Sequence, residues 1–341
     1  DKFSVNLSTT LSKLKTDRRD SEGGSRGNSM ISAAISAPPT LMPYNDDGSY
    51  RVLAIAYPFV ATDLINPLNF INEQTNRIKA NRVLANAALI YNPIPEITVK
   101  ISGGIENADD RTDNYTTRNY INSLGRAGVS TTQQTSLLNE NTISYNKTFG
   151  QGHNISAVAG VTYQDFVTTT LSASGTGFLS DIIETGGLGS AITPGIPESG
   201  YSKSVLLSYL GRVNYNLKDK YLITASIRRD GSSRYSDGNK WGYFPSGAVA
   251  WRVSSEEFMK TIPFISDLKL RASWGLTGSQ AISPYATLNQ LSSFRTVFDD
   301  ALFTTFAPGT RLPGNLKWET TEQKDIGVDL GILNNRILLT A

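Results

Sequence analysis

The sequence predicts an all-β fold, a transmembrane antiparallel β-barrel wall, and three observations support it. From residue 205 to 217 the odd positions are apolar or small and most even positions are polar, which is the period of a strand with one apolar face. The pattern restarts at 221–228 after the short turn 218–220, and the apolar face carries no charge. Short connections on one side alternate with long ones on the other. Strands of about ten alternating residues with this asymmetry are typical of transmembrane barrels.

The composition argues against several other classes of protein. Hydrophobic residues make up 39% of the 341, and no run approaches the roughly 20 apolar residues of a membrane-spanning helix. A barrel wall spreads its apolar residues by alternation, so this content suits one. The net charge of +2, from 32 basic and 30 acidic residues, is too balanced to indicate a nucleic-acid partner. The absence of cysteine excludes a disulfide framework and a thiolate metal site.

The first part of the chain predicts a strand, a long loop and a hairpin. Alternation over residues 3–11 predicts the first strand. The stretch that follows is rich in Gly, Ser, Asn and Pro and predicts an outer loop of about 60 residues. The hairpin joins strands 83–91 and 97–102 through 92–96, where two prolines are expected to end the pairing. For the polar segment 103–120 we predict a loop.

The remaining sequence repeats this pattern and brings the total to about eleven strands. Two Gly-rich segments, 172–178 and 184–190, predict a loop, and 254–267 predicts a longer turn. An Asn-Asn pair at 334–335 predicts the last turn. The strands expected in this part cover residues 143–149, 155–163, 205–217, 221–228, 249–253, 268–276, 326–332 and 336–341.

Aromatic residues near the short turns orient the predicted wall. Six of them lie on the apolar face close to a turn, as an aromatic girdle at the inner membrane–water interface would. Short turns are therefore expected to face the periplasm and long loops the outside. Core packing in a soluble β-sandwich is the alternative, although sandwiches seldom combine strands this long with loops this one-sided. The six residues are Tyr91, Tyr145, Phe149, Tyr215, Tyr221 and Trp251.

Three blocks of the sequence resemble a known family. They are SYLGRVNYNLKDKYLITASIRRDGSSRYSDGNKWGYFPSGAVAWRVSSEEF at 208–258, LKLRASWGLTGSQ at 268–280 and LKWETTEQKDIGVDLGILNNRI at 316–337. These blocks are similar to the signature regions of SusC/RagA-type TonB-linked outer membrane transporters, also called TonB-dependent, and they occur in that family's order. The resemblance is plain from residue 76 onward.

The resemblance implies an organisation that extends beyond these residues. In this family about 22 strands surround an N-terminal plug. Residues 1–341 would then form one partial outer-membrane β-barrel domain, about half of the wall. The plug, the TonB box, the signal peptide and the remaining strands would lie outside the chain. Half a wall leaves two unpaired strand edges in lipid, so we expect this piece not to be stable alone.

Groups that catalysis requires are largely missing, so we predict no enzyme activity, no metal site and no cofactor. The single histidine, His153, follows a tight turn, where a solvated side chain is expected rather than a general base. The sequence contains no nucleophile elbow, phosphate loop or dinucleotide-binding motif. Carboxylates cluster at 46–47 and 106–113 without the spacing of a calcium loop, and we expect solvated turns there.

Two sets of side chains are candidates for a functional site. Charged residues on the polar face of the strands are expected to point into the lumen, where they set ion selectivity in an open pore or pair with a plug, and the resemblance favours the plug. Aromatic and basic residues of the outer loops suit contact with an oligosaccharide or peptide. The first set is Lys100, Arg212, Arg228, Lys269, Arg271, Asp325 and Asp329. The second set is Tyr115, Tyr120, Arg234, Tyr235, Trp241 and Tyr285, together with Phe303 and Phe306.

The function that the resemblance implies is energised import across the outer membrane of a Gram-negative bacterium. In the family, a SusD-like surface lipoprotein covers the barrel, oligosaccharides or peptides enter, and TonB pulls on the plug from the periplasm. Two alternatives remain open. The first is a passive porin, in which the lumen charges line an open channel. The second is a soluble all-β carbohydrate-binding protein, which would purify without detergent.

Overall fold

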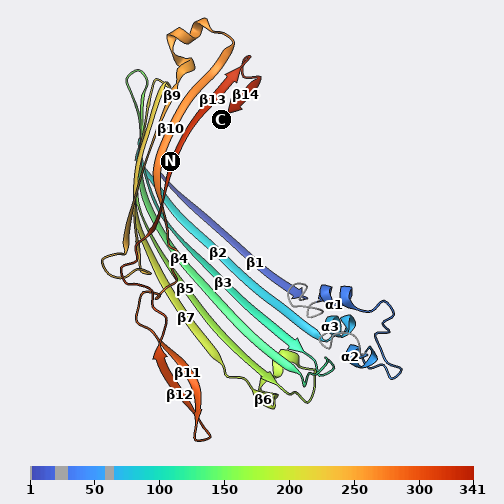
Figure 1. The fold of residues 1–341 in the computed structure, drawn as a ribbon. Helices are drawn as coiled ribbons and strands as arrows, with labels where there is room; N and C mark the ends of the chain where they lie inside the picture. Colours follow the sequence, from blue (N-terminus) through green and yellow to red (C-terminus); the bar gives the residue numbers. More distant parts are fainter. Residues whose placement is uncertain (1, 20–29, 58–64) are drawn as a thin grey trace.

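The computed structural model describes residues 2–19, 30–57 and 65–341. Its main element is one curved, open antiparallel sheet, in which strands follow one another in the order β1-β2-β3-β4-β5-β7-β8-β9-β10-β13-β14 (Figure 1). The short strand β6 pairs with β5, and β11 and β12 form a separate hairpin. The predicted all-β wall is therefore confirmed, and eleven strands lie along the path of the sheet.

The strands differ widely in length. They are β1 (Phe3–Arg18), β2 (Gln74–Ile94), β3 (Ile97–Thr116), β4 (Arg126–Phe149), β5 (His153–Thr176), β6 (Thr193–Pro194), β7 (Glu198–Leu217), β8 (Tyr221–Ser232), β9 (Trp241–Arg252), β10 (Ile265–Ser279), β11 (Leu291–Phe298), β12 (Ala301–Pro308), β13 (Glu319–Ile332) and β14 (Ile337–Thr340). Within the described residues β1 pairs with β2 alone and β14 with β13 alone, so these two strands form the edges of the sheet.

Short helices lie in the connections. Those between β1 and β2 are α1 (Met30–Ser36), α2 (Leu53–Ala56) and α3 (Pro67–Asn72), grouped near the ends of β1 and β2 in Figure 1. The Asn66 side chain caps α3 by accepting a hydrogen bond from the Leu68 amide, and Pro67 occupies the first helical position. The 3₁₀ helices are η1 (Glu184–Ser190), η2 (Val253–Ser255) and η3 (Glu257–Thr261). None of the described helices has the length and apolar character needed to cross a membrane.

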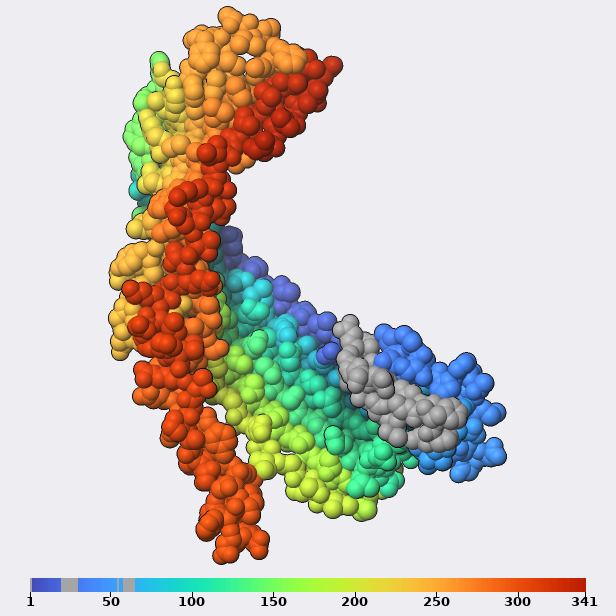
Figure 2. All heavy atoms as spheres, viewed as in Figure 1, coloured from blue at the N-terminus to red at the C-terminus, as the bar shows by residue number. Residues whose placement is uncertain are grey.

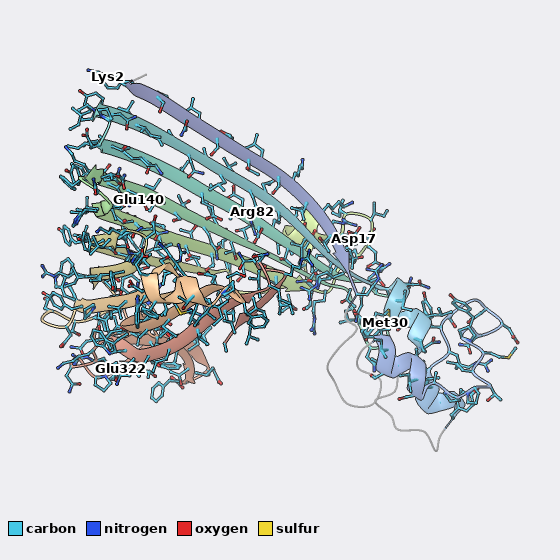
Figure 3. All side chains as sticks on the ribbon, turned by 90° about the horizontal axis from the view of Figure 1, so that it is seen from above. Lys2, Asp17, Met30, Arg82, Glu140 and Glu322 are labelled. Atoms are coloured by element: carbon cyan, nitrogen blue, oxygen red, sulfur yellow. The ribbon has the colours of Figure 1, made fainter. Side chains whose placement is uncertain are left out.

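The register gives the sheet two chemically different faces. Residues directly opposite each other on antiparallel strands share a face. One such row runs across five strands through Leu217, Tyr221, Trp251, Leu270 and Val328. Side chains stand on both sides of the curved sheet (Figure 3). We call the side that carries this row the apolar face, and the opposite side the polar face.

Two segments for which the sequence predicts loops are in fact strand. The polar segment 103–120 continues β3 as far as Thr116, and 172–176 belongs to β5. The prediction was wrong because a backbone ladder needs no apolar side chains, and apolar alternation ends where contact with lipid ends. Strands β4 and β5 each hold 24 residues. About 9 to 11 residues suffice to cross the bilayer, so these strands rise well beyond it.

The prolines of the turn after β2 do not end the pairing where expected. Strand β2 continues to Ile94, which pairs with Ile97 after a register shift that follows Tyr91. Pro93 lies inside this irregularity, where a missing backbone N–H costs the ladder no hydrogen bond. Pro95 then lies in the two-residue turn. The predicted hairpin is present, but it is longer than the prolines suggested.

The hairpin of β11 and β12 was not predicted. Its two-residue turn consists of Asp299 and Asp300, with φ angles of 49° and 57°. Two left-handed residues between paired strands make a tight hairpin turn whose twist matches that of the strands, and Asp tolerates this conformation. Two acidic turn residues between alternating segments were the signal that sequence reasoning missed. The hairpin projects away from the body of the sheet (Figure 2).

Candidate functional site

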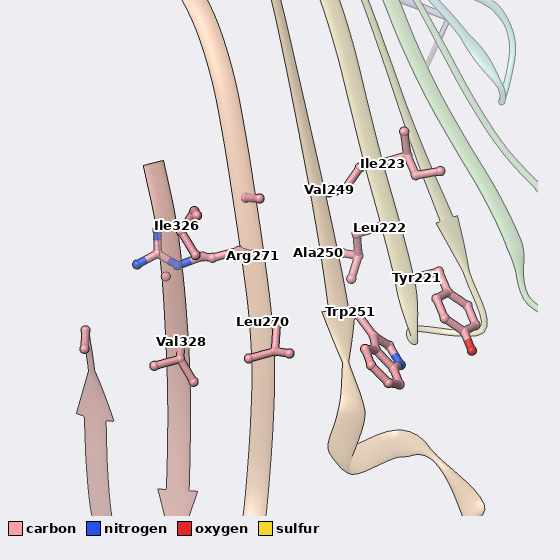
Figure 4. Close-up of a pocket in the computed structure, with 13 residues that line it drawn as sticks. Tyr221, Leu222, Ile223, Val249, Ala250, Trp251, Leu270, Arg271, Ile326 and Val328 are labelled. Atoms are coloured by element: carbon pink, nitrogen blue, oxygen red, sulfur yellow. The ribbon is translucent and has the colours of Figure 1, made fainter. Parts of the chain in front are cut away.

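The turn end of the sheet gathers aromatic residues around one carboxylate. Tyr221 and Trp251 face each other across β8 and β9 (Figure 4). The Tyr221 hydroxyl donates to Glu256 Oε1 at 2.7 Å, and Lys220 Nζ donates to Glu256 Oε2 at 2.9 Å. Trp251 Nε1 donates to Glu256 Oε1 at 3.2 Å. Hydrogen bonds from Tyr221, Lys220 and Trp251 lower the pKa of Glu256 to about 2. This contact fixes the connection 253–264 against the aromatic residues.

The other aromatic residues expected near the turns also lie at this end. Phe3 and Tyr91 stack with their ring centres 4.4 Å apart on β1 and β2. His153 is the first residue of β5, directly after the turn, and its Nδ1 lies 2.7 Å from the Tyr215 hydroxyl. Tyr145 opposes Ile97, and Phe149 opposes His153. All six predicted girdle residues therefore lie within a few residues of a short turn.

Two shallow depressions lie on the apolar face. One has a volume of about 690 Å³ and is lined by residues of β8, β9, β10 and β13, among them Ile223, Val249 and Leu270 (Figure 4). The other has about 590 Å³ and is lined by Ile143, Gly211 and neighbouring residues. Most of their lining side chains belong to the apolar face, which a barrel turns toward lipid, although Arg271 and Arg212 of the polar face also border them. They are therefore grooves for hydrocarbon and not substrate pockets.

The seven charged candidates share the polar face. Along each strand, side chains alternate between the two faces, and each of these residues lies at a position that alternates with the apolar ones. Arg228 Nε lies 2.7 Å from Asp230 Oδ1, and its Nη2 donates to Ser208 Oγ at 3.0 Å. Arg271 Nε lies 3.5 Å from Asp329 Oδ2. The set consists of Lys100, Arg212, Arg228, Lys269, Arg271, Asp325 and Asp329.

Three members of this set form no ion pair among the described residues, although Lys269 stands directly opposite Asp329, which pairs with Arg271 instead. Among the described residues, no carboxylate lies within ion-pair distance of Lys100, Arg212 or Lys269. Lys100 lines a polar depression of about 350 Å³ together with Glu140 and Asn86. The arrangement can donate and accept hydrogen bonds to polar groups, or attract carboxylates from another segment. Contact of these residues with a plug or with lumen water stays a prediction.

A further polar depression lies nearer the outer ends of the strands. It has a volume of about 380 Å³, and its lining includes Glu106, Gln134, Ser202 and Arg234. Arg234 Nη1 donates to the Ile282 carbonyl at 3.1 Å, while its Nε is buried without a partner. Carboxylate, amide, hydroxyl and guanidinium groups in one hollow can bind polyhydroxylated or amide-bearing molecules. The carboxylates of 106–113 lie on a strand, so the solvated turn expected there was wrong.

Tyr115 and Tyr235 are structural rather than exposed. Tyr115 lies in β3, is 2% exposed and packs against Phe178, so its placement in a loop was wrong. Its hydroxyl donates to Asp181 Oδ1 at 2.7 Å. Burial and the hydrogen bond to Asp181 raise the pKa of Tyr115 well above its ordinary value. Tyr235 is 2% exposed and stacks on Trp318 at 5.4 Å. Neither tyrosine is available to a substrate in this structure.

Trp241 also differs from the prediction. It begins β9 and lies on the apolar face, opposite Gly231, rather than in a loop. The other outer-loop candidates do lie in connections: Tyr120 contacts Phe70, and the Tyr285 hydroxyl accepts a hydrogen bond from the Lys203 amide at 2.9 Å. Phe303 and Phe306 stand exposed on β12. Sequence reasoning missed Glu256 and Asp181, because nothing local marks an acidic loop residue as the partner of a distant tyrosine.

Comparison with known proteins agrees with this geometry. A family model described as TonB dependent receptor-like, beta-barrel, matches residues 24–341. TonB-dependent receptor P3 of Formosa agariphila is 35% identical over 327 residues, which cover 93% of this chain and 32% of that protein. TonB-dependent receptor SusC of Bacteroides thetaiotaomicron is 42% identical over 143 residues, 40% of this chain and 14% of SusC.

A solved structure shows the same fold. The RagAB peptide transporter structure superposes with a TM-score of 0.83 at 22% identity, over 98% of this chain and 38% of that one. The chain thus spans about a third of the length of the curated relatives that match it throughout. It belongs to the TonB-dependent receptor β-barrel family, whose members are outer membrane proteins of Gram-negative bacteria.

Proposed function

We propose that this chain forms part of the wall of an energised importer that carries oligosaccharides across the outer membrane. The observation that carries the proposal is the polar face: charged, amide and hydroxyl side chains line it in depressions of about 350 and 380 Å³. Such groups suit a polyhydroxylated cargo. Family membership adds the energy source, since TonB drives these receptors. Peptides are the second candidate cargo, because RagAB, whose structure is similar, is a peptide transporter.

The rest of the transporter is expected elsewhere in the protein. The plug, the TonB box and the remaining strands would complete the barrel between β1 and β14, whose outer edges have no neighbour among the described residues. Unpaired strand edges in lipid cost several kcal/mol per group, which favours closure. Lys100, Arg212 and Lys269 would meet carboxylates of the plug. TonB would act on the plug from the side of the short turns.

The β11–β12 hairpin supports a surface lipoprotein of the SusD type as partner. One of its faces carries Phe294, Phe298 and Phe303, with exposed fractions of 56%, 75% and 49%. A lone two-stranded hairpin is marginally stable in water, and a contiguous exposed apolar patch marks an interaction site. The hairpin projects beyond the ends of β9 and β10 opposite the short turns (Figure 1), so a partner bound to it would be extracellular. A lid that covers the barrel mouth fits this position.

The test is uptake by cells that carry the intact gene, measured across a panel of oligosaccharides and peptides with and without the proton-motive force. We expect uptake of an oligosaccharide that stops when the force is dissipated. Uptake that continues unchanged would reject energised import and leave a passive porin. Uptake of peptides alone would show that the cargo is a peptide and not an oligosaccharide, while energised import would still hold. Extraction of the protein without detergent would instead support a soluble binding protein.

A further inference from the structure

Arg229 stands on the apolar face among aromatic rings. It lies on β8 directly opposite Tyr243 of β9 and Tyr209 of β7. The centre of its guanidinium group lies 4.2 Å from the ring centre of Trp241 and 5.3 Å from that of Tyr243. A cation over aromatic faces at these distances is attracted by the ring quadrupoles. The planar guanidinium group on β8 is therefore held against two aromatic side chains of β9.

The arrangement depends on a glycine. A Cβ on Gly231 would lie 2.7 Å from Cζ3 of Trp241, so the indole ring lies directly on the backbone of β8. Tyr209 stacks on Trp241 with ring centres 6.1 Å apart. Residues of β7, β8 and β9 thus form one cluster, Tyr209, Arg229, Trp241 and Tyr243, which we call the Arg229 cluster. Its geometry is set by the strands and not by a loop.

The register places this cluster at the outer boundary of the membrane. Along β8 the apolar face begins at Tyr221 next to the turn and continues through Ile223, Ala225 and Ile227 before it reaches Arg229. About nine to eleven residues of a tilted strand span the hydrocarbon layer. Arg229 is the ninth residue counted from Tyr221, so it lies where the hydrocarbon of the outer leaflet meets the headgroups.

The charge of Arg229 has no counter-charge within the part of the chain that is described. Among residues 2–19, 30–57 and 65–341, no carboxylate lies at ion-pair distance from Arg229, and its Nε is buried without a hydrogen-bond partner. Two lysines on the same face differ in this respect. Lys203 lies 2.8 Å from Asp165, and Lys324 lies 3.0 Å from Glu322. A cation at the edge of a membrane is costly unless it pairs with an anion.

A groove for hydrocarbon begins directly beneath this cation. Ile227, two residues from Arg229 on the same face, lines the depression of about 590 Å³. Its other lining residues on this face are small or aliphatic except Tyr145, and they include Ala157, Ala159, Gly211 and Ala225. A guanidinium fork matches a phosphate group in shape and charge. The surface therefore combines a binding site for phosphate at Arg229 with an apolar groove for an acyl chain on the side nearer the membrane centre.

We propose that the Arg229 cluster binds a phosphorylated glycolipid of the outer leaflet, with the phosphate on Arg229 and one acyl chain in the groove beneath it. The groove distinguishes a lipid headgroup from free phosphate, because an inorganic ion would leave these apolar residues unoccupied. The site lies on the opposite side of the wall from the cargo path. It is independent of which molecule the barrel imports.

The test uses the intact transporter, extracted in mild detergent, with Arg229→Gln, Arg229→Lys and the matched control Lys324→Gln, a lysine on the same face that already has a partner. Each protein is incubated with diphosphorylated lipid A, with its dephosphorylated form or with inorganic phosphate, and retained lipid is measured by mass spectrometry. We expect R229Q to retain about tenfold less phosphorylated lipid than the unmodified protein, since a charge-assisted bidentate contact is lost.

The remaining variants and ligands test whether the bound molecule is a lipid or a free anion, and whether its phosphate group is needed. R229K keeps the charge but loses the fork, so it is expected to retain an intermediate amount, and K324Q is expected to behave as the unmodified protein. Equal retention by R229Q and the unmodified protein would overturn the proposal. Equal retention of the dephosphorylated lipid would overturn the role of the phosphate. The phosphate arm is measured by thermal unfolding, and stabilisation of the unmodified protein but not of R229Q by inorganic phosphate alone would replace the lipid site by a plain anion site.

Discussion

The carboxylate of Glu256 accepts a hydrogen bond from the indole nitrogen of Trp251 at 3.2 Å, and so joins the connection after β9 to the aromatic row at the turn end of the wall. Tyr221 reaches the same Oε1 atom from β8 at 2.7 Å. One acidic residue outside the strands thus holds two residues that would anchor the wall at the inner interface.

This contact gives the stability a defined pH dependence. The folded-state pKa of Glu256 is lowered from 4.5 to about 2, so its contribution is complete above the unfolded value and is lost as the pH falls toward 2. The difference in thermal unfolding midpoint between the unmodified protein and Glu256→Gln is expected to be largest at neutral pH and to vanish near pH 2. Melting curves across this window check it. A difference that does not change with pH would contradict the role of the charge.

A close approach in the outer part of the wall predicts a destabilising substitution. A Cβ on Gly278 would lie 2.1 Å from Cζ of Phe244, a ring that is 7% exposed and packs edge-on against Trp318. Gly278→Ala is expected to cost about 1 to 3 kcal/mol through overpacking. Gly128→Ala is the matched control, because a Cβ there meets nothing within 4 Å. Equal unfolding free energies for both variants would show that Phe244 can move aside.

Removal of one hydroxyl is expected to loosen the outer connection between β5 and β6. Tyr115 donates to Asp181, which also accepts from the Arg118 amide at 3.1 Å. Burial alone would raise the pKa of Asp181, but these hydrogen bonds outweigh it and hold the pKa below its ordinary value. Tyr115→Phe is expected to speed protease cleavage at the exposed Ile182 roughly tenfold on intact cells. Tyr201→Phe, an exposed tyrosine, should leave the rate unchanged; acceleration by both would make the effect non-specific.

The hairpin can be tested through its partner. A double variant, Phe294→Ser with Phe303→Ser, removes two exposed rings from one face without disturbing the wall. Central aromatic residues of an interface each contribute about 2 kcal/mol or more, so co-purification of the surface lipoprotein is expected to fall at least tenfold. Thr305→Ser on the same face is the control. Unchanged co-purification would locate the partner elsewhere and leave the hairpin unexplained.

Arg212 distinguishes a plugged barrel from an open pore. Its side chain is exposed on the polar face of the wall, with no carboxylate nearby among the residues described. If a plug carboxylate meets it, Arg212→Gln leaves that charge buried and unpaired, a loss of about 3 to 5 kcal/mol in the intact protein. Arg295→Gln, on the exposed hairpin, should have almost no effect. A stable R212Q protein with altered ion selectivity would instead favour an open channel.

The sequence was sufficient for the membrane-facing part of the fold. Alternation around Val213 and Ile223, with short turns on one side, predicts the strands there and the face that each side chain occupies, because lipid enforces the period of two. Prediction from apolar alternation failed for the parts of the strands that extend beyond the lipid. There Asp110 and Asp113 lie on a strand with polar neighbours, and polar alternation leaves no hydrophobic pattern to detect.

The candidate site was predictable in part for the same reason. The alternation of apolar and polar positions along the strands is enough to assign Arg228 and Arg271 to the polar face. The fate of Tyr115, Tyr235 and Trp241 depends on contacts with residues far away in the sequence, such as Asp181 and Trp318, and no local pattern reports these.

The length of the strands sets how far the wall stands above the membrane. At about 3.3 Å per residue and a tilt of about 40°, the 24 residues of β5 raise the wall by roughly 60 Å. The hydrocarbon layer accounts for about 25 Å of this height. The wall therefore extends roughly 35 Å beyond the hydrocarbon layer, and this part has water on both of its faces. In the proposed importer, a cargo molecule would therefore pass between walls that stand in water on both faces before it reaches the level of the lipid.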